Sequence, residues 1–402
     1  MCVYVKLQLT KDKTIDISLP SGGAKSVSDI TGVELFPPDS GDFPAVRLVH
    51  RKKAWHVAAA GTVKAPNGEL PTRWEDTPHQ PTWELPRAFQ SPRAALAVNS
   101  EMGSFSQTTA DAVVQEMMTS GQTASPQPAA EKPSPDGKRR FGVRRDASAP
   151  KQEPAKSAAS TSLAAKPLFP KAGEAVSSNG RRFTVRPMVE DNFHLCTSLP
   201  EFQTLWLSRL LPEGRRPTAS SIQLAESALM ASILLQPEFI AADGSALAVF
   251  VRRDAIFFAG YRRGEPVLWR KCPGVGGSAA MRDTVRRTLG IDEDLVDTVL
   301  NDSLIDPRPA LEPFMRPVLD QLALSLDYLS GKQGLRFDHA FLMGLGSGAA
   351  HWLDYAERSL HVRLVSPDPF EGLAVDKGVE AGDTSRLLVA LGAAIAGAEV
   401  VQ

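Results

Sequence analysis

The stretch FLMGLGSGAAHWLDYAERSL, residues 341–360, carries the most informative pattern in this chain. Its apolar start predicts a buried strand, glycines end that strand, and a helix is expected after them. A buried strand that passes through a glycine turn into a helix is typical of an α/β fold. The turn either holds a phosphate or a nucleotide or only changes the direction of the chain, and the residues themselves leave both readings open.

The residues on either side of this stretch predict a β-meander followed by helices. The three strands of the meander are separated by short polar turns and are expected at 246–252, 255–262 and 265–272. Helices are expected at 278–290, 292–304 and 313–331. Downstream, a strand at 361–367 precedes a last helix from Ser385 onward.

The first part of the chain has a similar order. A β-hairpin is predicted over 44–66, followed by a strand at 93–100, a helix at 109–118, a strand at 181–189 and amphipathic helices at 198–214 and 218–236. A meander followed by helices is therefore predicted twice. No tandem sequence repeat with a period of about 20 to 50 residues accompanies it.

Composition bounds the class of protein. The chain has 402 residues, 43% of them hydrophobic, which suits two packed units. A net charge of −1 excludes a chain-wide attraction to nucleic acid, and none is predicted as a partner. Cys2, Cys196 and Cys272 lack metal-ligand spacing and favour a reducing compartment. The apolar stretch near the C-terminus is shorter than the roughly 20 residues that span a bilayer.

A change of composition separates the two parts of the first half. From about residue 120 to residue 180 the chain is rich in Ala, Ser, Pro, Lys and Gln, which predicts a disordered insertion. This segment contains the basic run GKRRFGVRR, residues 137–145. Such a run is either a solvated surface or a site of attraction to anionic lipid.

Four stretches together resemble the PilM family of type IV pilus assembly proteins, within the actin-like ATPase fold. They are the opening meander at 32–71, the strand-glycine-helix segment at 264–291, the long helix leading into 341–373, and LLVALGAAIAG at 387–397. The resemblance implies two actin-like, ribonuclease H-like α/β domains that face a nucleotide cleft, with a small subdomain inserted in the first.

The resemblance also implies domain boundaries. It predicts an N-terminal extension at 1–28, a first domain at 29–85 and 213–242, an inserted subdomain at 86–212 that contains the disordered segment 120–180, a second domain at 243–384 and a closing helix at 385–402.

In active members of this fold, an acid and glycines in the first hairpin hold Mg²⁺ and phosphate. Glu34 stands where that acid would be, and prolines follow it. Asp39, Ser40 and Gly41 either restore part of the phosphate loop or form an ordinary surface turn. Arg252, Arg253 and Asp254 occupy the second hairpin, and an exposed corner explains them better than a phosphate cradle.

Two glycine turns are the remaining nucleotide candidates. Gly274, Gly276 and Gly277 stand just before a predicted helix, where free N–H groups and the helix dipole favour an anion, although a tight turn explains them equally well. In actin-like proteins the turn of the opening stretch lies against the adenosine. The residues that the resemblance assigns to this contact are Gly344, Gly346, Ser347 and Gly348, with Leu345 in place of a glycine.

The resemblance implies a partner as well. Members of the family bind the cytoplasmic tail of an inner-membrane protein, PilN in the usual system, and the pilus assembly ATPase machinery is a further candidate partner. The predicted groove lies between the first domain and the inserted subdomain, with Trp206 and Arg209 as candidate contacts. Trp206 also lies on the apolar face of its predicted helix, so a role in the core remains open.

The predicted function is therefore a cytoplasmic scaffold at the inner face of the inner membrane, attached through its partner, with weakened binding of ATP and Mg²⁺. No catalytic or metal-binding residue is assigned. The alternatives are an adaptor without nucleotide and an active ATPase or small-molecule kinase of the same fold. The enzyme needs an acid for magnesium or for the substrate hydroxyl, and the candidates Glu34, Asp39 and Asp243 all lack a suitable glycine context.

Overall fold

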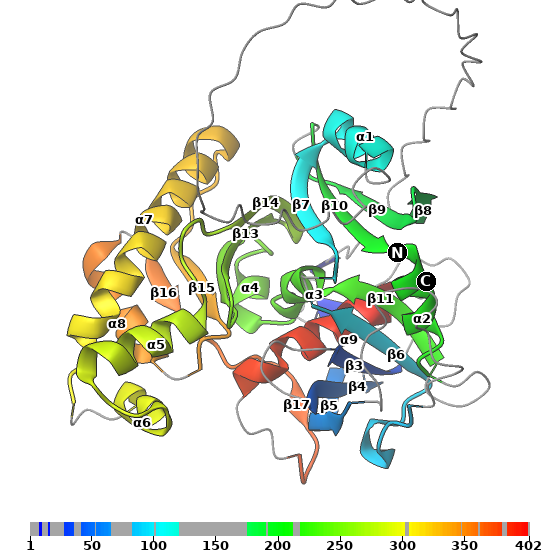
Figure 1. Cartoon of the computed structure of the whole chain (residues 1–402), viewed down its shortest axis with the longest axis horizontal. Coiled ribbons are helices and arrows are strands. Elements are labelled where there is room, and N and C mark those ends of the chain that lie inside the picture. The colour runs from blue at the N-terminus through cyan, green and yellow to red at the C-terminus, as the bar shows by residue number, and fades with distance from the viewer. Residues whose placement is uncertain are drawn as a thin grey trace, which may run out of the picture.

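A computed structural model describes most of the chain (Figure 1). The described residues are 8–9, 15–16, 28–35, 42–52, 54–65, 83–99, 102–119, 175–189, 192–211, 218–301, 305–346, 348–360, 362–379 and 384–400. The predicted sites at Asp39, Ser40, Gly41 and Ser347 lie outside these residues, as does the basic run at 137–145.

The first large sheet contains six strands in the order β11-β6-β3-β4-β5-β17. Strands β3, β4 and β5 form the predicted antiparallel meander, and β6 and β11 continue the sheet in parallel with β3. Their bounds are Asp29–Leu35 (β3), Asp42–Arg51 (β4), Ala54–Lys64 (β5), Arg93–Val98 (β6), Thr218–Leu224 (β11) and Ala374–Val375 (β17).

The second large sheet has five strands in the order β14-β13-β12-β15-β16. Strands β12, β13 and β14 form an antiparallel meander, while β15 and β16 run parallel to β12. This is the strand order of the first sheet without β17, so the duplication that the pattern predicts is present. The bounds are Ala246–Val251 (β12), Ile256–Arg262 (β13), Glu265–Lys271 (β14), His339–Met343 (β15) and Arg363–Val365 (β16).

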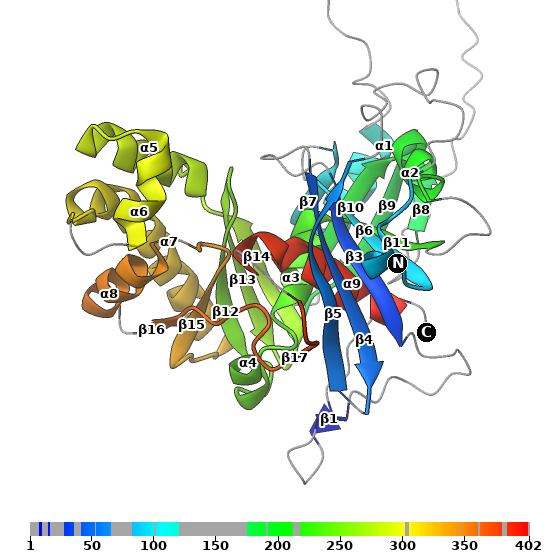
Figure 2. The same cartoon turned by 90° about the horizontal axis from the view of Figure 1, so that it is seen from below.

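Helices α3 (Ala225–Ser232) and α9 (Leu388–Val400) lie between the two large sheets, as Figure 2 shows. One apolar cluster joins these helices to the inner faces of both sheets. The outer face of the first sheet is covered in part by α2 (Glu201–Ser208) and the 3-10 helix η2 (Arg87–Phe89). The outer face of the second sheet is covered by α5 (Ser278–Leu289), α6 (Val296–Asn301), α7 (Arg308–Gln333) and α8 (Ala349–Ser359).

Shorter elements complete these two halves. They are the strands β1 (Gln8–Leu9) and β2 (Ile15–Asp16), helix α4 (Pro237–Ala241) and the 3-10 helices η4 (Glu293–Leu295) and η5 (Thr384–Leu387). Strands β1 and β2 pair with each other and stand outside the larger sheets. Among the described residues, no helix combines the length and the apolar character needed to cross a membrane.

A smaller sheet interrupts the first half between β6 and β11. It has the order β7-β10-β9-β8 and is covered by α1 (Ala110–Thr119). Its strands are Ser104–Thr109 (β7), Ala175–Ser178 (β8), Arg181–Pro187 (β9) and Phe193–Pro200 (β10). The inserted sheet also touches the second half: the backbone N–H of Trp269 in β14 donates to Gln107 Oε1 at 2.8 Å, and the ring of Phe105 packs edge-on against the indole of Trp269.

The structure differs from several predicted boundaries. Residues 218–224 form strand β11 rather than the start of a helix, because they pair with β6 along its whole length. Strand β6 belongs to the first half rather than to the inserted subdomain, because it pairs with β3, whereas helix α2 packs against strands of both. The predicted disordered segment is too long at its C-terminal end, where residues 175–178 form β8.

Candidate functional site

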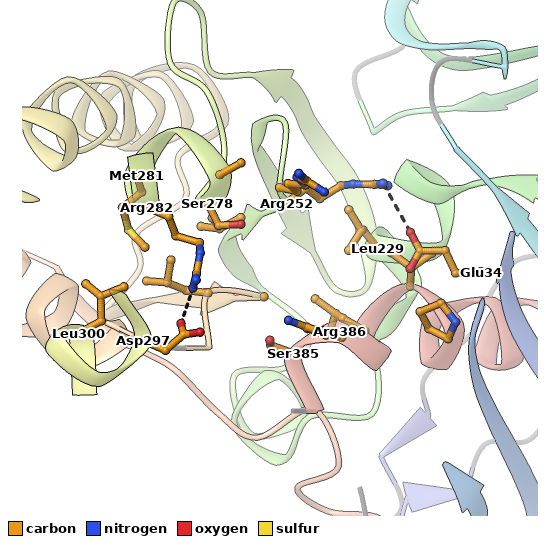
Figure 3. Close-up of a pocket in the computed structure, with 18 of the residues that line it drawn as sticks. Glu34, Leu229, Arg252, Ser278, Met281, Arg282, Asp297, Leu300, Ser385 and Arg386 are labelled. Carbon is orange, nitrogen blue, oxygen red and sulfur yellow. Dashed lines mark hydrogen bonds and ion pairs between the residues drawn. The ribbon is translucent and has the colours of Figure 1, made fainter. Parts of the chain in front are cut away.

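A pocket of about 700 Å³ opens between the two halves, where the first strands of both meanders end (Figure 3). The first half contributes residues from β3, β4, α3 and α9, and the second half contributes the ends of β12 and β15 and the start of α5. This is the junction at which the resemblance places the nucleotide cleft. The lining combines an apolar group, including Leu229, Val251 and Met281, with several charged side chains.

A buried ion pair closes one side of this pocket. Arg252 Nη2 donates to Glu34 Oε1 at 3.5 Å, and the two side chains are 6% and 7% exposed (Figure 3). Glu34 belongs to β3 of the first half, and Arg252 follows β12 of the second. The sequence predicts Arg252 at an exposed hairpin corner, and this prediction is wrong. Its neighbours Arg253 and Asp254 are the exposed residues of that corner.

The protonation of Glu34 is shifted by its surroundings. Burial raises the pKa of this carboxyl from 4.5 to about 7, because desolvation outweighs the opposing attraction of Arg252, and Asp254 raises it further. Asp254 Oδ1 lies 3.7 Å from Arg252 Nε and its side chain is 43% exposed. Near neutral pH, the carboxylate that faces Arg252 therefore carries only part of its charge.

A second charged group lies across the pocket. Arg282 on α5 donates to Glu293 Oε1 at 3.2 Å and also pairs with Asp297 at the start of α6 (Figure 3). Ser385 and Arg386 of η5 line the side toward the first half. This cluster was not predicted from the sequence. An acidic start such as that of 292–304 also suits a helix N-terminus, so the sequence gives no sign that these acids pair with Arg282.

Gly276 and Gly277 shape the entry to α5 but do not line the pocket. A Cβ at Gly277 would overlap the carbonyl oxygen of Arg252. The amide groups at this helix start are already used, because Ser278 N donates to Arg252 O at 2.7 Å and Ala279 N donates to Arg253 O at 3.0 Å. In this conformation Gly277 allows the helix to pack closely on the hairpin, and the two amide groups after it are not available to an anion.

The glycine turn of the opening stretch reaches the pocket with its first residues, Gly344 and Leu345. Gly344 has a φ of +82°, and a Cβ there would lie 2.6 Å from the carbonyl oxygen of Val251. Gly346 (φ +58°) and Gly348 (φ +84°) do not line the pocket. The turn therefore reverses the chain closely against β12, and it also forms a wall of the candidate site.

Other predicted residues lie elsewhere. Asp243 precedes β12, at the opposite end of that strand from the pocket, and pairs with Arg263 at 3.7 Å. The side chain of Trp206 is 4% exposed and belongs to the core of the first half, so it offers no surface for a partner in this conformation. Arg209, just after α2, is exposed.

The described residues do not fit a magnesium nucleotide. Mg²⁺ needs oxygen ligands in octahedral geometry, usually with a carboxylate among them. The buried carboxylate at this site, Glu34, instead faces the guanidinium of Arg252, which would repel a cation. Among the described residues, no group of three or more His, Cys, Asp or Glu side chains is arranged to hold a metal.

Comparison with solved structures identifies the fold. A chain of the "PilM-PilN type IV pilus biogenesis complex" is similar over 93% of this chain and 99% of that one, with a TM-score of 0.53 and 14% sequence identity. This chain has an actin-like fold. Its resemblance to PilM-like proteins is thus confirmed at the level of the fold. No protein-family model and no curated protein sequence matches the chain.

Other solved structures are similar with lower TM-scores. A protein with actin-like ATPase fold from Bacteroides thetaiotaomicron covers 90% of this chain and 96% of its own, with a TM-score of 0.36 and 10% identity. The cytoplasmic domain of EpsL, an inner-membrane component of the type II secretion system of Vibrio cholerae, covers 90% of this chain and 93% of its own, with a TM-score of 0.30 and 9% identity.

Proposed function

We propose that this chain is an actin-like scaffold of type IV pilus or related envelope machinery, and that it binds the cytoplasmic tail of an inner-membrane partner. The observation that carries the proposal is the likeness to a chain of the PilM-PilN complex, which extends over 93% of this chain and 99% of that one. A scaffold of this kind would work at the cytoplasmic face of the inner membrane and would be attached there by its partner.

The proposal includes loss of magnesium-dependent ATP hydrolysis. The acid that would organise the metal, Glu34, is buried against Arg252, so the carboxylate is drawn to a protein cation instead. The competing reading, an ATPase or small-molecule kinase, needs an acid free to hold magnesium or to take a proton from a hydroxyl. Purified protein is expected to release no phosphate from Mg²⁺-ATP above background. Sustained release that is abolished by Glu34→Gln would contradict this part of the proposal.

The partner tail is placed at the junction of the first half and the inserted sheet. Helix α2 lies at this junction, because it packs against β9 and β10 of the inserted sheet and against β11 of the first half. Its exposed side carries Leu205, which is 36% exposed, and Arg209 follows one turn later. An apolar side chain beside an arginine is a suitable contact for a short peptide.

A photo-crosslinking amino acid at position 209 tests the site, in the organism that encodes the chain. The control carries the same amino acid at Leu324 on α7, which is 54% exposed and belongs to the second half. We expect an adduct with one inner-membrane protein from position 209 and none from position 324. Deletion of the gene is expected to abolish surface pili or the export function of the related machinery. Normal pili and normal export in the deletion strain would overturn the proposal.

A further inference from the structure

The chain returns from the second half to the first along residues 366–379, here called the strap (Figure 2). The first part of the strap is held firmly. Phe370 is 6% exposed and belongs to the apolar cluster between the two large sheets. Gln236 Nε2 donates to the carbonyl oxygen of Pro369 at 3.0 Å in a buried contact. These contacts fix the start of the strap to the centre of the molecule.

The second part of the strap is held more weakly. Strand β17 consists of Ala374 and Val375 alone, and both side chains are exposed. It pairs in parallel with β5 at His56 and Val57. A register shift in β5 directly after Val57 bends that strand, which limits the pairing to these residues. Because the pairing buries little apolar surface, we expect β17 to open at a lower free energy than the rest of the sheet.

Asp376, the residue after β17, makes the charged contacts of this attachment. Its backbone N–H donates to the carbonyl oxygen of Val57 at 3.0 Å. Its carboxylate accepts a hydrogen bond from Arg51 Nη1 at 3.1 Å, and Oδ1 lies 3.5 Å from His56 Nδ1. The side chains of Arg51 and Asp376 are 52% and 31% exposed, so water and salt weaken their attraction. One partly exposed carboxylate therefore secures a strand of two residues.

The strap leads to the wall of the pocket. Thr384, the first residue of η5, comes eight residues after Asp376. Ser385 and Arg386 of η5 line the pocket, and Leu387 lies in the apolar cluster between the sheets. The helix η5 also packs against β4, the strand that pairs with β5. A short length of chain thus connects the edge of the first sheet to the pocket wall.

We propose that residues 374–376 form a releasable attachment, which holds the strap on β5 and thereby fixes the position of η5 at the pocket. In the attached state, which this structure shows, β17 removes slack from the chain before η5. On release, β17 leaves the edge of β5 and η5 becomes more mobile. The inference does not depend on the pilus role, because it concerns two connected parts of this chain.

Hydrogen–deuterium exchange of the full chain, followed by mass spectrometry, tests the proposal. The variant Asp376→Asn removes the carboxylate that pairs with Arg51. We expect about fivefold faster exchange than in the wild type in peptides that cover 372–379, since a partly exposed ion pair contributes at most about this factor. Peptides that cover 384–387 should also exchange faster, because η5 is released with the strap. High salt should act on the wild type in the same direction.

Two further variants separate this attachment from a general change of charge. Glu371→Gln removes the same charge from an exposed residue of the strap, five positions before Asp376, and should leave exchange unchanged in both segments. The double variant Arg51→Asp/Asp376→Arg exchanges the two charges and is expected to restore slow exchange. Peptides of β12 and β13, in the second half, should exchange alike in all variants and show that each is folded.

Four outcomes would overturn the proposal: unchanged exchange at 372–379 in Asp376→Asn, faster exchange there without any change at 384–387, the same acceleration in Glu371→Gln, or a double variant that exchanges as fast as Asp376→Asn. None of these measurements involves pili or the partner tail. Failure here is therefore distinguishable from failure of the scaffold role.

Discussion

The two halves of the molecule share one strand order but bring opposite charges to the pocket. At the end of its first strand, the first half places Glu34, and at the corresponding point the second half places Arg252. In the nucleotide-binding form of this fold, two hairpins face one phosphate chain. Here the two hairpins attract each other. One residue from each half, Glu34 and Arg252, therefore joins the two hairpins by a buried ion pair.

The halves also differ in how their helices pack. Helix α9 of the first half is rich in Ala and Gly, and Gly392 lets it approach α3 until a Cβ would overlap the carbonyl oxygen of Ala228. The second half instead buries long side chains, such as Met315, Leu322 and Trp352. A close backbone contact tolerates no added atom, whereas a contact between long side chains can adjust.

The largest expected effect comes from breaking the close contact of the first half. Gly392→Val adds a branched side chain where no space exists, and we expect a loss of more than about 4 kcal/mol of unfolding free energy, or no folded protein. Urea unfolding measures the loss. Ala396→Val, a half-buried position of the same helix, is the control and should cost about 1 kcal/mol or less. Similar losses in both variants would show that helix propensity, not the contact, is responsible.

Breaking the ion pair between the halves is expected to have the next largest effect. Arg252→Met leaves the buried Glu34 without its counter-ion and should cost about 3 kcal/mol. The double variant Glu34→Leu/Arg252→Met removes both charges and should regain most of that loss, since two apolar residues replace the pair. Chemical denaturation of both variants at pH 8 checks the prediction. An equal or greater loss in the double variant would contradict it.

The pH dependence of stability isolates Glu34. Its folded-state pKa of about 7 lies above the usual 4.5, so the folded state binds more protons between these values. Unfolding free energy should therefore fall as pH rises through this window, by at most about 3 kcal/mol. Glu34→Gln cannot lose this proton, so its stability relative to the wild type should increase from pH 5 to pH 8. Denaturant titrations at both pH values measure the difference, and a constant difference would be inconsistent with the raised pKa.

The smallest effect is expected from a substitution in α7 of the second half, at a position where an added side chain meets no other atom. Gly331 lies in α7, is exposed, and has no atom within 4 Å of the place where a Cβ would be. Gly331→Ala should therefore stabilise the protein by about 0.5 to 1 kcal/mol through helix propensity alone. Thermal unfolding detects the gain. A loss instead would show that this helix end is packed against something that restricts it.

Much of the fold could be predicted because local pattern and final structure agree. The meander at 246–272 and the strand-turn-helix at 341–360 appear as predicted, since their apolar spacing matches the strand and helix periods. Strand β11 was missed because Ile222 and Leu229 also fit a helical spacing. Pairing with β6, a contact over 125 residues in the case of Thr218 and Arg93, decided the outcome.

The site could be predicted less well because its contacts are distant in sequence. Glu34 was correctly named as the acid beside the cleft, but its partner Arg252 is 218 residues away. An arginine in a short hairpin turn is usually exposed, and nothing local indicates that this one is buried. The hydrogen bonds at the start of α5 could not be predicted for the same reason. Their acceptors, the carbonyl groups of Arg252 and Arg253, lie in the turn between β12 and β13, about 25 residues earlier in the chain.

The inserted sheet has a mechanical consequence. Besides its place in the first half, it reaches the second half through the ring pair of Phe105 and Trp269 and through Arg186, whose Nη2 lies 3.2 Å from Glu265 Oε2. The two halves are thus joined at two places, by the apolar packing of α3 and α9 and by the contacts of the inserted sheet with β14. A force applied to the inserted sheet would therefore be transmitted to both halves, and we expect this second attachment to resist rotation of the halves about the central helices.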